Sequence, residues 1–320
     1  MRSRLLFVAV AVLYSVPGLA RDKEPYCAWD GAINTSFLDA VDGDLLSANS
    51  QAAKDIIADA LPFAMPHSMY PSDSEELLVQ PNYINWYDRD LREPLWVAYH
   101  LKKEDVDHGV KREDSFRSDP RLEYWERSDC ADYKEDIFDQ GHMVPSADMK
   151  RSREAMASTY LMSNMSPQYC QFNRGPWQVL EELTRKWAIK YGELWVVSGT
   201  ISDRYGDNHR DADQIAWRMS GKRGTRVAIP SHQYKILIRM DGDSIKTLAF
   251  ILQNSDLNVS NEDMKKYISS SITTLDVISE MSGFSFGKDV TLDQSEALWP
   301  FPGKIPKTLA YNCKSSYPEY

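Results

Sequence analysis

The stretch Asp139-Gln140-Gly141-His142-Met143-Val144-Pro145-Ser146-Ala147-Asp148 is the most informative part of this 320-residue chain. Two further blocks follow it, Ser163-Asn164-Met165-Ser166-Pro167-Gln168 and Phe172-Asn173-Arg174-Gly175-Pro176-Trp177. A histidine such as His142 has an ordinary pKa of about 6.5, so it can be neutral at physiological pH and accept a proton. Asn173 can offer a side-chain oxygen to Mg²⁺, a hard cation that keeps several water ligands. The blocks therefore indicate a hydrolytic site that combines a histidine base with a metal ion.

Joined in this order, the three blocks resemble the DNA/RNA non-specific endonuclease family of the ββα-metal fold. That family includes secreted sugar-non-specific nucleases and mitochondrial endonuclease G. The resemblance runs from Leu77 to Phe286. It implies an α+β fold with a central, mainly antiparallel sheet flanked by helices. It also implies hydrolysis of DNA and RNA phosphodiesters to 5′-phosphate products, with Mg²⁺ as the cofactor and Mn²⁺ as a substitute.

The resemblance also implies a role for each candidate catalytic residue. His142 matches the general base, and Asn173 matches the direct metal ligand. Glu181 matches a residue that holds the ion through water. Asn164 matches a position that orients the site or contacts phosphate, and Arg185 matches one that neutralises charge. Each of these roles is an expectation that the resemblance supplies.

Three residues are candidates for substrate binding: Arg112, Gln140 and Arg174. Arg112 resembles an upstream arginine that binds phosphate in the family. Gln140 departs from the family, which has Arg immediately before the glycine. A neutral amide lacks the fixed charge and forked donors of a guanidinium, so weaker phosphate binding or an altered substrate preference is expected. The alternatives to a nuclease are a nucleic-acid-binding protein with weakened catalysis and a phosphodiesterase that acts on another phosphate ester.

Some motif residues also allow structural readings. Asn173 could instead cap the helix that follows it. Glu182 is adjacent to Glu181, so either glutamate could hold the metal-bound water. Asp139 is expected to fix the motif backbone or the surroundings of the histidine. Gly141 is expected to permit an unusual backbone path and a close approach by the phosphate.

The helix that carries Glu181 is expected to span residues 176–191, because Pro suits a first helical position and Gly192 follows the last one. Glu181 and Arg185 are four residues apart and share a face, which is expected to point into the same cleft as Asn173. Apolar residues recur at steps of three and four and predict a buried stripe, formed by Trp177, Leu180, Leu183, Trp187 and Tyr191.

Runs of β-branched and aromatic residues predict four strands, at Leu95–Leu101, Leu194–Val197, Gln233–Arg239 and Lys246–Leu252. The last two runs flank Asp241–Ser244, which reads as a hairpin turn, so these strands are expected to be antiparallel neighbours. A further helix is expected between Asn49 and Ala60, within a segment outside the resemblance.

The first twenty residues resemble a secretory signal, because two arginines precede an apolar run and a small-residue cleavage site. The run is shorter than the roughly 20 apolar residues that a membrane span needs. We therefore expect a secreted, extracellular protein with no membrane association after signal removal. Its expected parts are the signal peptide 1–20, an N-terminal extension of unknown role 21–75 and the endonuclease domain 76–320. A homodimer is an expected form, since members of the family are often dimers.

The chain is acidic, with a formal net charge of −10 at pH 7. Removing residues 1–20 takes away two positive charges and leaves −12. DNA and RNA, the expected partners, must therefore bind through a local basic surface, because phosphate contacts supply most non-specific affinity. The candidates for that surface are Lys150, Arg151, Arg153, Arg174, Arg185, Lys186 and Lys190.

Four cysteines in an exported chain suggest two disulfides, for which three connectivities exist. The favoured pairing joins Cys27 to Cys313, which would tie the two ends of the chain together. It also joins Cys130 to Cys170, which would bracket the segment that carries His142.

Overall fold

The computed structural model describes residues 35–43, 45, 47–107, 109–133, 138–202, 215–219, 225–286, 292–293, 299–309 and 313. The expected signal peptide lies outside these residues. The helices are α1 (Thr35–Gly43), α2 (Gln51–Ala60), α3 (Lys103–Asp107), α4 (Arg153–Ser158), α5 (Cys170–Phe172), α6 (Gln178–Tyr191), α7 (Met264–Ser270) and α8 (Leu275–Ser282), with the short turns η1 (Cys130–Tyr133), η2 (Ser146–Asp148), η3 (Met162–Asn164) and η4 (Asn173–Trp177). The strands are β1 (His67–Ser68), β2 (Glu75–Val79), β3 (Ile84–Asp88), β4 (Glu93–Lys102), β5 (Phe138–His142), β6 (Met165–Tyr169), β7 (Glu193–Ile201), β8 (Ala216–Met219), β9 (Arg226–Ile229), β10 (His232–Asp241), β11 (Ser244–Gln253), β12 (Ile272–Thr273), β13 (Phe284–Ser285) and β14 (Leu292–Asp293).

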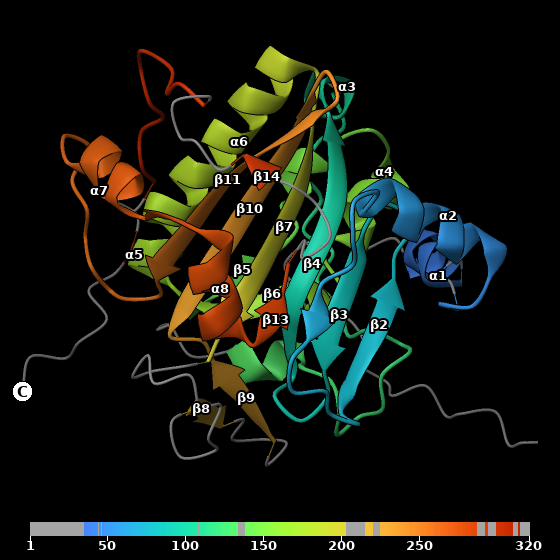
Figure 1. The fold of residues 1–320 in the computed structure, drawn as a ribbon. Coiled ribbons are helices and arrows are strands. Elements are labelled where there is room, and N and C mark those ends of the chain that lie inside the picture. The colour runs from blue at the N-terminus through green and yellow to red at the C-terminus, as the bar shows by residue number, and fades with distance from the viewer. Residues whose placement is uncertain are drawn as a thin grey trace, which may run out of the picture.

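A large sheet forms the centre of the molecule, with strands in the order β12-β11-β10-β7-β4-β3-β2 (Figure 1). Every neighbouring pair in this order is antiparallel, and β14 adds to β11 in parallel. All four predicted strands are present, as β4, β7, β10 and β11. The predicted hairpin is also confirmed, because Asp241 pairs with Ser244 at the turn between β10 and β11. The expected α+β fold with a mainly antiparallel central sheet is therefore confirmed.

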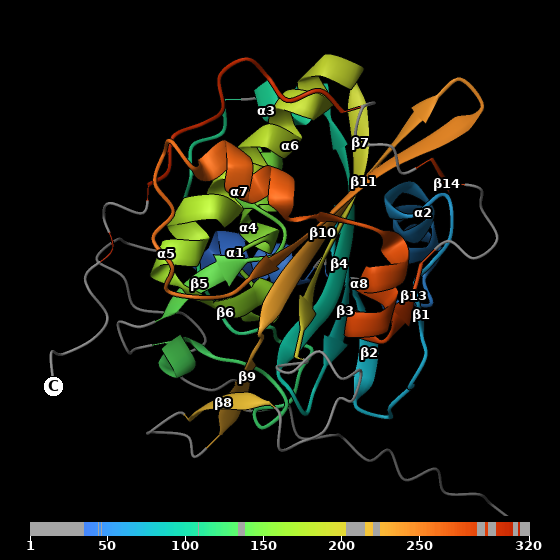
Figure 2. The ribbon, with the colours of Figure 1, turned by 60° about the vertical axis from the view of Figure 1, so that its left-hand side comes forward.

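The sheet has an apolar core on each face, because residues along its central strands alternate between the two sides. On β7, Leu194 and Val196 belong to the core that contains α6, whereas Trp195 and Val197 belong to the core that contains α2 and α8. Figure 2 shows the sheet nearly edge-on, with α6 and α7 on one side and α2 and α8 on the other. The sheet is thus the middle of three layers, and the site described below lies on the α6 side.

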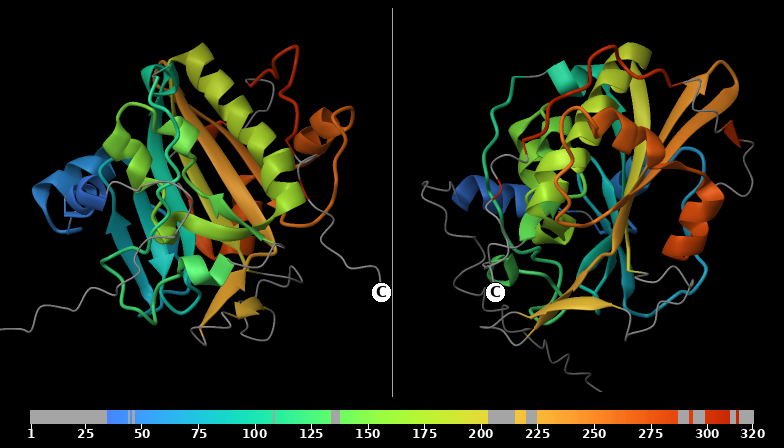
Figure 3. Two further views of the ribbon diagram at one scale, coloured as in Figure 1. Left: turned by 180° about the vertical axis from the view of Figure 1, so that it is seen from behind. Right: turned by 90° about the vertical axis from the view of Figure 1, so that its left-hand side faces the viewer.

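Helix α6 lies against the sheet, as the left view of Figure 3 shows from behind. The predicted stripe is confirmed, since four of its members are fully buried and Tyr191 packs against them. Burying each such large side chain contributes roughly 1.5–3 kcal/mol. The helix ends at Gly192, whose φ of 95° is a conformation that glycine adopts at little cost.

The start of α6 differs from the expectation of a regular helix beginning at Pro176. A π-helical turn, η4, precedes α6, and Gly175 inside it has non-helical dihedrals of −106° and −115°. Pro176 lacks an N–H and Gly175 leaves the helical region, so the chain is kinked between Asn173 and α6. The kink sets the direction of Asn173 separately from that of the helix.

Strands β5 and β6 form an antiparallel pair in which His142 lies opposite Met165. The chain passes from β6 through α5 and η4 directly into α6. Two strands and one helix therefore bring the three motif blocks together. The predicted helix at 49–60 is also confirmed as α2, whose first turn is capped by the Ser50 side chain.

The N-terminal helix α1 lies outside the expected nuclease domain and packs on α4. Leu38 and Val41 contact Ala157, and the carboxylate of Asp42 accepts hydrogen bonds from the fully buried guanidinium of Arg117. Within the described part of the chain, no helix has the length and apolarity needed to cross a bilayer.

The cysteine pairing differs from the prediction. Cys170 is joined to Cys313, with a Cα–Cα distance of 5.7 Å, so both favoured pairs are wrong. Cys130 is also disulfide-bonded, and Cys27 lies outside the described residues. We call residues 299–309, with Cys313 beyond them, the C-terminal strap. The cysteine pairing depends on the path of this strap across the molecule, so the positions of the cysteines in the sequence could not select among the three connectivities.

Candidate functional site

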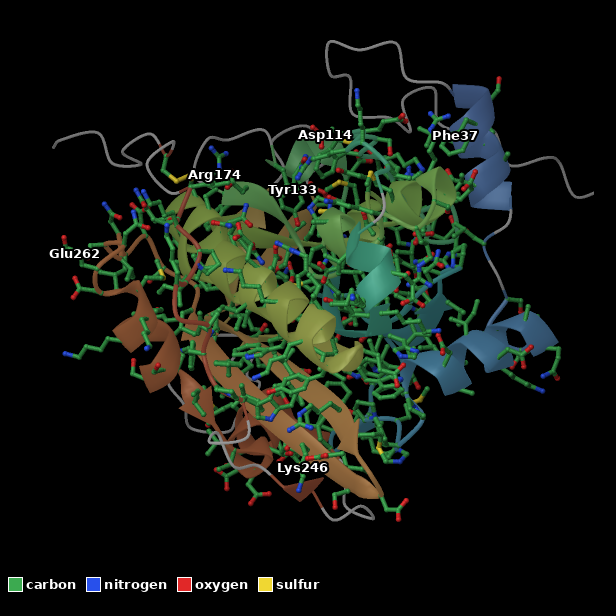
Figure 4. The ribbon with its side chains drawn as sticks, turned by 90° about the horizontal axis from the view of Figure 1, so that it is seen from above. Phe37, Asp114, Tyr133, Arg174, Lys246 and Glu262 are labelled. Carbon is green, nitrogen blue, oxygen red and sulfur yellow. A yellow bond between two sulfur atoms is a disulfide. The ribbon has the colours of Figure 1, made fainter. Side chains whose placement is uncertain are left out.

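A pocket of about 710 Å³ opens beside β5 and the start of α6. It brings together His142, Asn173 and Glu181, the three residues expected to perform the chemistry. The three candidates for substrate binding also line it, namely Arg112, Gln140 and Arg174. Figure 4 labels Asp114, Tyr133 and Arg174 of its wall, which lie along one edge of the molecule in that view.

The imidazole of His142 is held in one tautomer by the backbone. The ring donates a hydrogen bond to the carbonyl of Gln140, and Nε2 has no hydrogen-bond partner. Nδ1 must therefore be the protonated nitrogen, which leaves a lone pair on Nε2. A neutral imidazole with its acceptor nitrogen unused is suited to take a proton from a nucleophile.

Aromatic rings and a nearby cation keep His142 neutral. The imidazole packs edge-on against Tyr160 and Phe116, with ring centroids 5.0 and 5.5 Å away. Burial lowers the pKa of His142 to about 3, and the Arg112 guanidinium adds to this effect, while the hydrogen bond to Gln140 opposes it. Desolvation and a neighbouring positive charge both disfavour the imidazolium ion.

Asn173 is oriented by Asp139 rather than by the helix that follows it. Its Nδ2 donates to Asp139 Oδ2 at 2.9 Å, so the amide oxygen is the atom left for a ligand. The same carboxylate accepts two hydrogen bonds from Arg174, at 2.9 and 2.8 Å. The side chain of Asp139 thus arranges Asn173 and Arg174, whereas the sequence led us to expect contacts with the motif backbone or the histidine.

Glu181 reaches the pocket wall from the first turn of α6. Burial raises the pKa of Glu181, and the charges of Lys235 and Arg185 oppose that rise. Lys235 lies fully buried on β10, where its ammonium donates to Ser198 Oγ at 2.7 Å and sits 4.5 Å from the centroid of the Trp177 ring. A buried cation near Glu181 favours the ionised carboxylate that a metal ion would need.

Lys235 is a residue that the sequence reasoning missed. It stands two positions from Leu237 on a predicted strand, and Leu237 belongs to the core on the α6 face. Strand alternation puts both side chains on that face. A lysine at an inward position of an apolar strand was the available signal.

Arg185 does not point into the pocket, which corrects the expectation that it joins Glu181 and Asn173 there. Its Nη1 donates to Asp148 Oδ1 at 2.8 Å, and Tyr99 donates to the other oxygen of that carboxylate at 2.7 Å. Asp148 is fully buried, so its charge requires this compensation. Arg185 therefore lies outside the pocket lining, and its positive charge opposes the rise in the pKa of Glu181.

The contacts of Asn164 fit the expectation that it orients the site, and they do not fit the alternative of contact with phosphate. The amide is fully buried, where its oxygen accepts from Val144 N and its nitrogen donates to the carbonyls of Val144 and Thr159. Its hydrogen-bonding groups are used by the backbone, so none is directed at phosphate. Asn164 fixes the loop that leaves His142, which makes it a positioning residue.

Gly141 is needed for packing against a side chain. A Cβ at this position would lie 2.1 Å from Cδ of Gln168, which is itself fully buried and bonded to Gln233. The expected reason for the glycine was close approach by the phosphate. The contact with Gln168 gives an independent reason: without a Cβ at Gly141, the side chain of Gln168, from the second motif block, can pack directly against β5.

Most of the proposed basic surface is already ion-paired. Arg151 pairs with Asp105, and Arg153 pairs with Glu113. Of the seven candidate cations only Arg174 lines the pocket, where Arg112 joins it from the other side. Both pocket arginines are ion-paired as well, Arg112 with Asp114 at 2.7 Å and Arg174 with Asp139 at 2.8 Å, so a bound phosphate would compete with these carboxylates for them.

The pocket residues fit a hydrated divalent ion better than a multidentate cage. Among the residues that the structure describes, no three His, Cys, Asp or Glu side chains form a metal-binding group. The donors present are the Asn173 oxygen and the Glu181 carboxylate, both hard oxygen ligands. Mg²⁺ accepts one or two protein ligands and completes its shell with water and phosphate oxygens.

The antiparallel pair β5–β6 and helix α6, which present these side chains in one pocket, define a protein of the ββα-metal class. A crystal structure of the EndoG/EndoGI complex contains a similar fold, with a TM-score of 0.62 and 24% sequence identity over 77% of this chain and 95% of that one. The family model for DNA/RNA non-specific endonucleases matches residues 64–293. The chain therefore belongs to the DNA/RNA non-specific endonuclease family.

Named relatives are similar over part of the chain. The mitochondrial nuclease EXOG of Danio rerio is 29% identical over 197 residues, which cover 60% of this chain and 56% of the relative. Nuclease C1 of Cunninghamella echinulata var. echinulata is 30% identical over 221 residues, covering 68% of this chain and 84% of the relative. The matched part spans between 56% and 63% of the mitochondrial relatives from Danio rerio, Xenopus laevis, Schizosaccharomyces pombe and Homo sapiens.

The relatives contradict the expectation of a secreted protein. Nuclease EXOG of Danio rerio and Xenopus laevis, nuclease 1 of Schizosaccharomyces pombe and endonuclease G of Homo sapiens are all named as mitochondrial. They point to a mitochondrial rather than a secreted location. The error arose because the location was inferred from residues 1–20 alone.

Proposed function

We propose that this protein is a metal-dependent endonuclease that hydrolyses phosphodiester bonds of DNA and RNA with little sequence preference. The observation that carries the proposal is the state of His142, a neutral imidazole with an unpartnered Nε2 in the same pocket as Asn173 and Glu181. Support comes from relatives that are named as nucleases.

Each pocket residue has a chemical part in this reaction. His142 Nε2 accepts a proton from the attacking water while the Gln140 carbonyl keeps Nδ1 protonated. Arg112 and Arg174 hold the phosphate oxygens and offset their charge. Mg²⁺, when bound, would stabilise the negative charge that develops on the phosphoryl group.

Two residues would hold the ion. Asn173 contributes its amide oxygen directly, because Asp139 engages the amide nitrogen. Glu181 holds water ligands of the ion through its carboxylate, which Lys235 and Arg185 favour in the ionised form. Mn²⁺ prefers similar oxygen ligands and is expected to substitute for Mg²⁺.

Gln140 supplies neutral hydrogen bonds where the family has an arginine. The pocket keeps two arginines, Arg112 and Arg174, so phosphate binding rests on them. Binding is expected to weaken steeply with salt, because it depends on cation–phosphate contacts.

The test compares cleavage of supercoiled plasmid and of RNA, with Mg²⁺ and with EDTA, by the wild type and by His142→Ala and Asn173→Ala. Loss of a general base reduces turnover by about 10²–10⁴-fold. His67→Ala and Asn258→Ala are the matched controls, because both residues are exposed and neither lines the pocket. Thermal unfolding of every variant checks that the fold is retained.

Three results would redirect the proposal. Undiminished cleavage by His142→Ala and Asn173→Ala would remove the mechanism. Binding of nucleic acid without metal-dependent cleavage by the wild type would select a binding protein. Cleavage of a small phosphodiester in preference to plasmid and RNA would select a phosphodiesterase with another substrate.

A further inference from the structure

The C-terminal strap, residues 299–309 with Cys313 beyond, follows the last residue of the family match and runs along α6 to the pocket. The carbonyl of Pro300 accepts from Trp187 at 3.1 Å, and that of Lys304 accepts from Lys186 at 3.3 Å. The red trace in Figure 2 follows this path from the end of α6 to the region of α5. The strap is thus built onto the helix that carries Glu181.

Two hydrogen bonds fix the strap where it meets the site. Leu309 N donates to the carbonyl of Arg174 at 2.7 Å, and Thr308 Oγ1 donates to the same carbonyl at 2.9 Å. Thr308 N donates in turn to Asn261 Oδ1 at 3.0 Å. These contacts hold the strap on the residue next to Asn173.

The disulfide closes the strap onto the pocket. Cys170 lines the pocket and lies three residues before Asn173, and its partner Cys313 lies four residues after Leu309. The disulfide and the hydrogen bonds to Arg174 therefore restrain Leu309 from both sides. Such restraints lower the entropy that the strap would lose when a substrate contacts it.

Leu309 gives the pocket an apolar contact beside its most polar residues. The side chain is 46% exposed and lines the pocket together with Arg174 and Asn173. A leucine side chain does not stabilise a bound phosphate, because it offers the anion neither a positive charge nor a hydrogen-bond donor. The sugar and base of a nucleotide offer the apolar area that would fit it.

We propose that the C-terminal strap forms a wall of the nucleotide-binding pocket and that Leu309 is a specificity-determining residue that contacts the nucleoside part of the substrate. The inference rests on the proposed nuclease function and deepens it. The wall adds recognition of the nucleoside to the recognition of phosphate by Arg112 and Arg174, and it is absent from the segment that defines the family.

The test separates nucleoside contact from catalysis by comparing two substrates. An oligonucleotide carries sugars and bases, whereas methyl p-nitrophenyl phosphate offers the phosphodiester without a nucleoside. Leu309→Ala should raise KM for the oligonucleotide about fivefold with kcat unchanged, as expected for removing a partly exposed apolar contact. The kinetics on the small diester should not change. Leu257→Ala is the matched control, because that leucine is 55% exposed and does not line the pocket.

Two further variants test whether the strap holds Leu309 in place. Cys313→Ser should raise KM for the oligonucleotide in the same direction as Leu309→Ala, because it removes one of the two restraints. Leu309→Met keeps most of the apolar volume and should restore KM to near the wild-type value. Both variants are checked for folding by thermal unfolding.

The outcomes distinguish this inference from the proposed function. A wild type that cleaves neither substrate would overturn the nuclease function itself. A wild type that cleaves both, with Leu309→Ala indistinguishable from Leu257→Ala, would overturn the inference alone. An equal loss of kcat on both substrates would also overturn it, because the strap would then act only by supporting the fold near Asn173.

Discussion

Replacing Asp139 by alanine should weaken the binding of Mg²⁺ at the proposed site. The carboxylate orients Asn173 through one hydrogen bond of 2.9 Å and holds Arg174 through two more. Without it, the Asn173 amide can rotate by half a turn and present its NH₂ group, which cannot bind a cation. The prediction rests on the proposed role of Asn173 as a metal ligand.

The three hydrogen bonds show how firmly Asp139 holds Asn173 and Arg174. A hydrogen bond to a charged group contributes about 1.5–3 kcal/mol, and the bond from the Asn173 amide is of this kind. The Arg174 side chain is 41% exposed, so its ion pair is screened by water and adds at most about 1 kcal/mol. Loss of a residue that orients a metal ligand typically costs 10–100-fold in affinity. We therefore expect the Kd for Mg²⁺ to rise by about 10–100-fold, or roughly 1.4–2.7 kcal/mol.

The assay measures Mg²⁺ binding by calorimetry and plasmid cleavage as a function of Mg²⁺ concentration. Cleavage by Asp139→Ala should be largely restored at high Mg²⁺. Glu113→Ala serves as the control, because Glu113 also pairs with an arginine, at 2.7 Å, but is exposed and does not line the pocket. An unchanged Kd for Mg²⁺ in a folded Asp139→Ala variant would refute the reasoning.

Three further predictions follow from the packing and charge of the site. Gly141→Ala should lower the free energy of unfolding by about 1–3 kcal/mol in urea, because the new Cβ overlaps the Gln168 side chain. Adding Gln168→Ala should recover part of this stability. An unchanged stability of Gly141→Ala would contradict the contact. Arg185→Met should cost about 3–5 kcal/mol in the same measurement, since it leaves the buried charge of Asp148 without its ion pair; a cost under about 1 kcal/mol would show that the pair is not required. The lowered pKa of His142 means that the unfolded chain binds a proton between pH 6.5 and about 3 that the folded protein does not, so stability from this group is complete above pH 6.5 and falls as the pH drops. Between pH 6.5 and 5.5, with EDTA present, the wild type should lose about 1 kcal/mol more than His142→Gln, and parallel losses would show that the imidazole is not buried in its neutral form.

The family resemblance that the three motif blocks carry was sufficient to predict a set of residues that meet in one pocket. His142, Asn173 and Glu181 meet in one pocket, together with Arg112, Gln140 and Arg174. Gln140, His142, Asn173 and Arg174 lie within the blocks and Glu181 follows the last of them closely, whereas Arg112 lies upstream of all three blocks. The strand pair β5–β6 and the kink at Gly175, which complete the arrangement, were not predicted from the sequence.

Asn164 and Arg185 show where motif matching stopped being informative. Asn164 was expected to orient the site or to contact phosphate, and Arg185 to neutralise charge in the cleft. The polar atoms of both are bonded to partners from other elements, which fits the orienting alternative for Asn164 and keeps Arg185 out of the pocket lining. A motif gives the residue type at a position but does not say whether Val144 or Asp148 will occupy its polar atoms. Hydrogen bonds between distant segments decide that, and no local pattern encodes them.

The sequence by itself determined the strands and the helix stripe, because hydrophobic periodicity is a local property, and the family resemblance of its motif blocks supplied the candidate site residues. Only the tertiary structure decided that the charge of Lys235 acts on Glu181, that Cys170 pairs with Cys313 and that Leu309 reaches the pocket. These contacts join residues separated by many tens of positions. Packing and charge compensation select them among many arrangements that the linear chain leaves equally open.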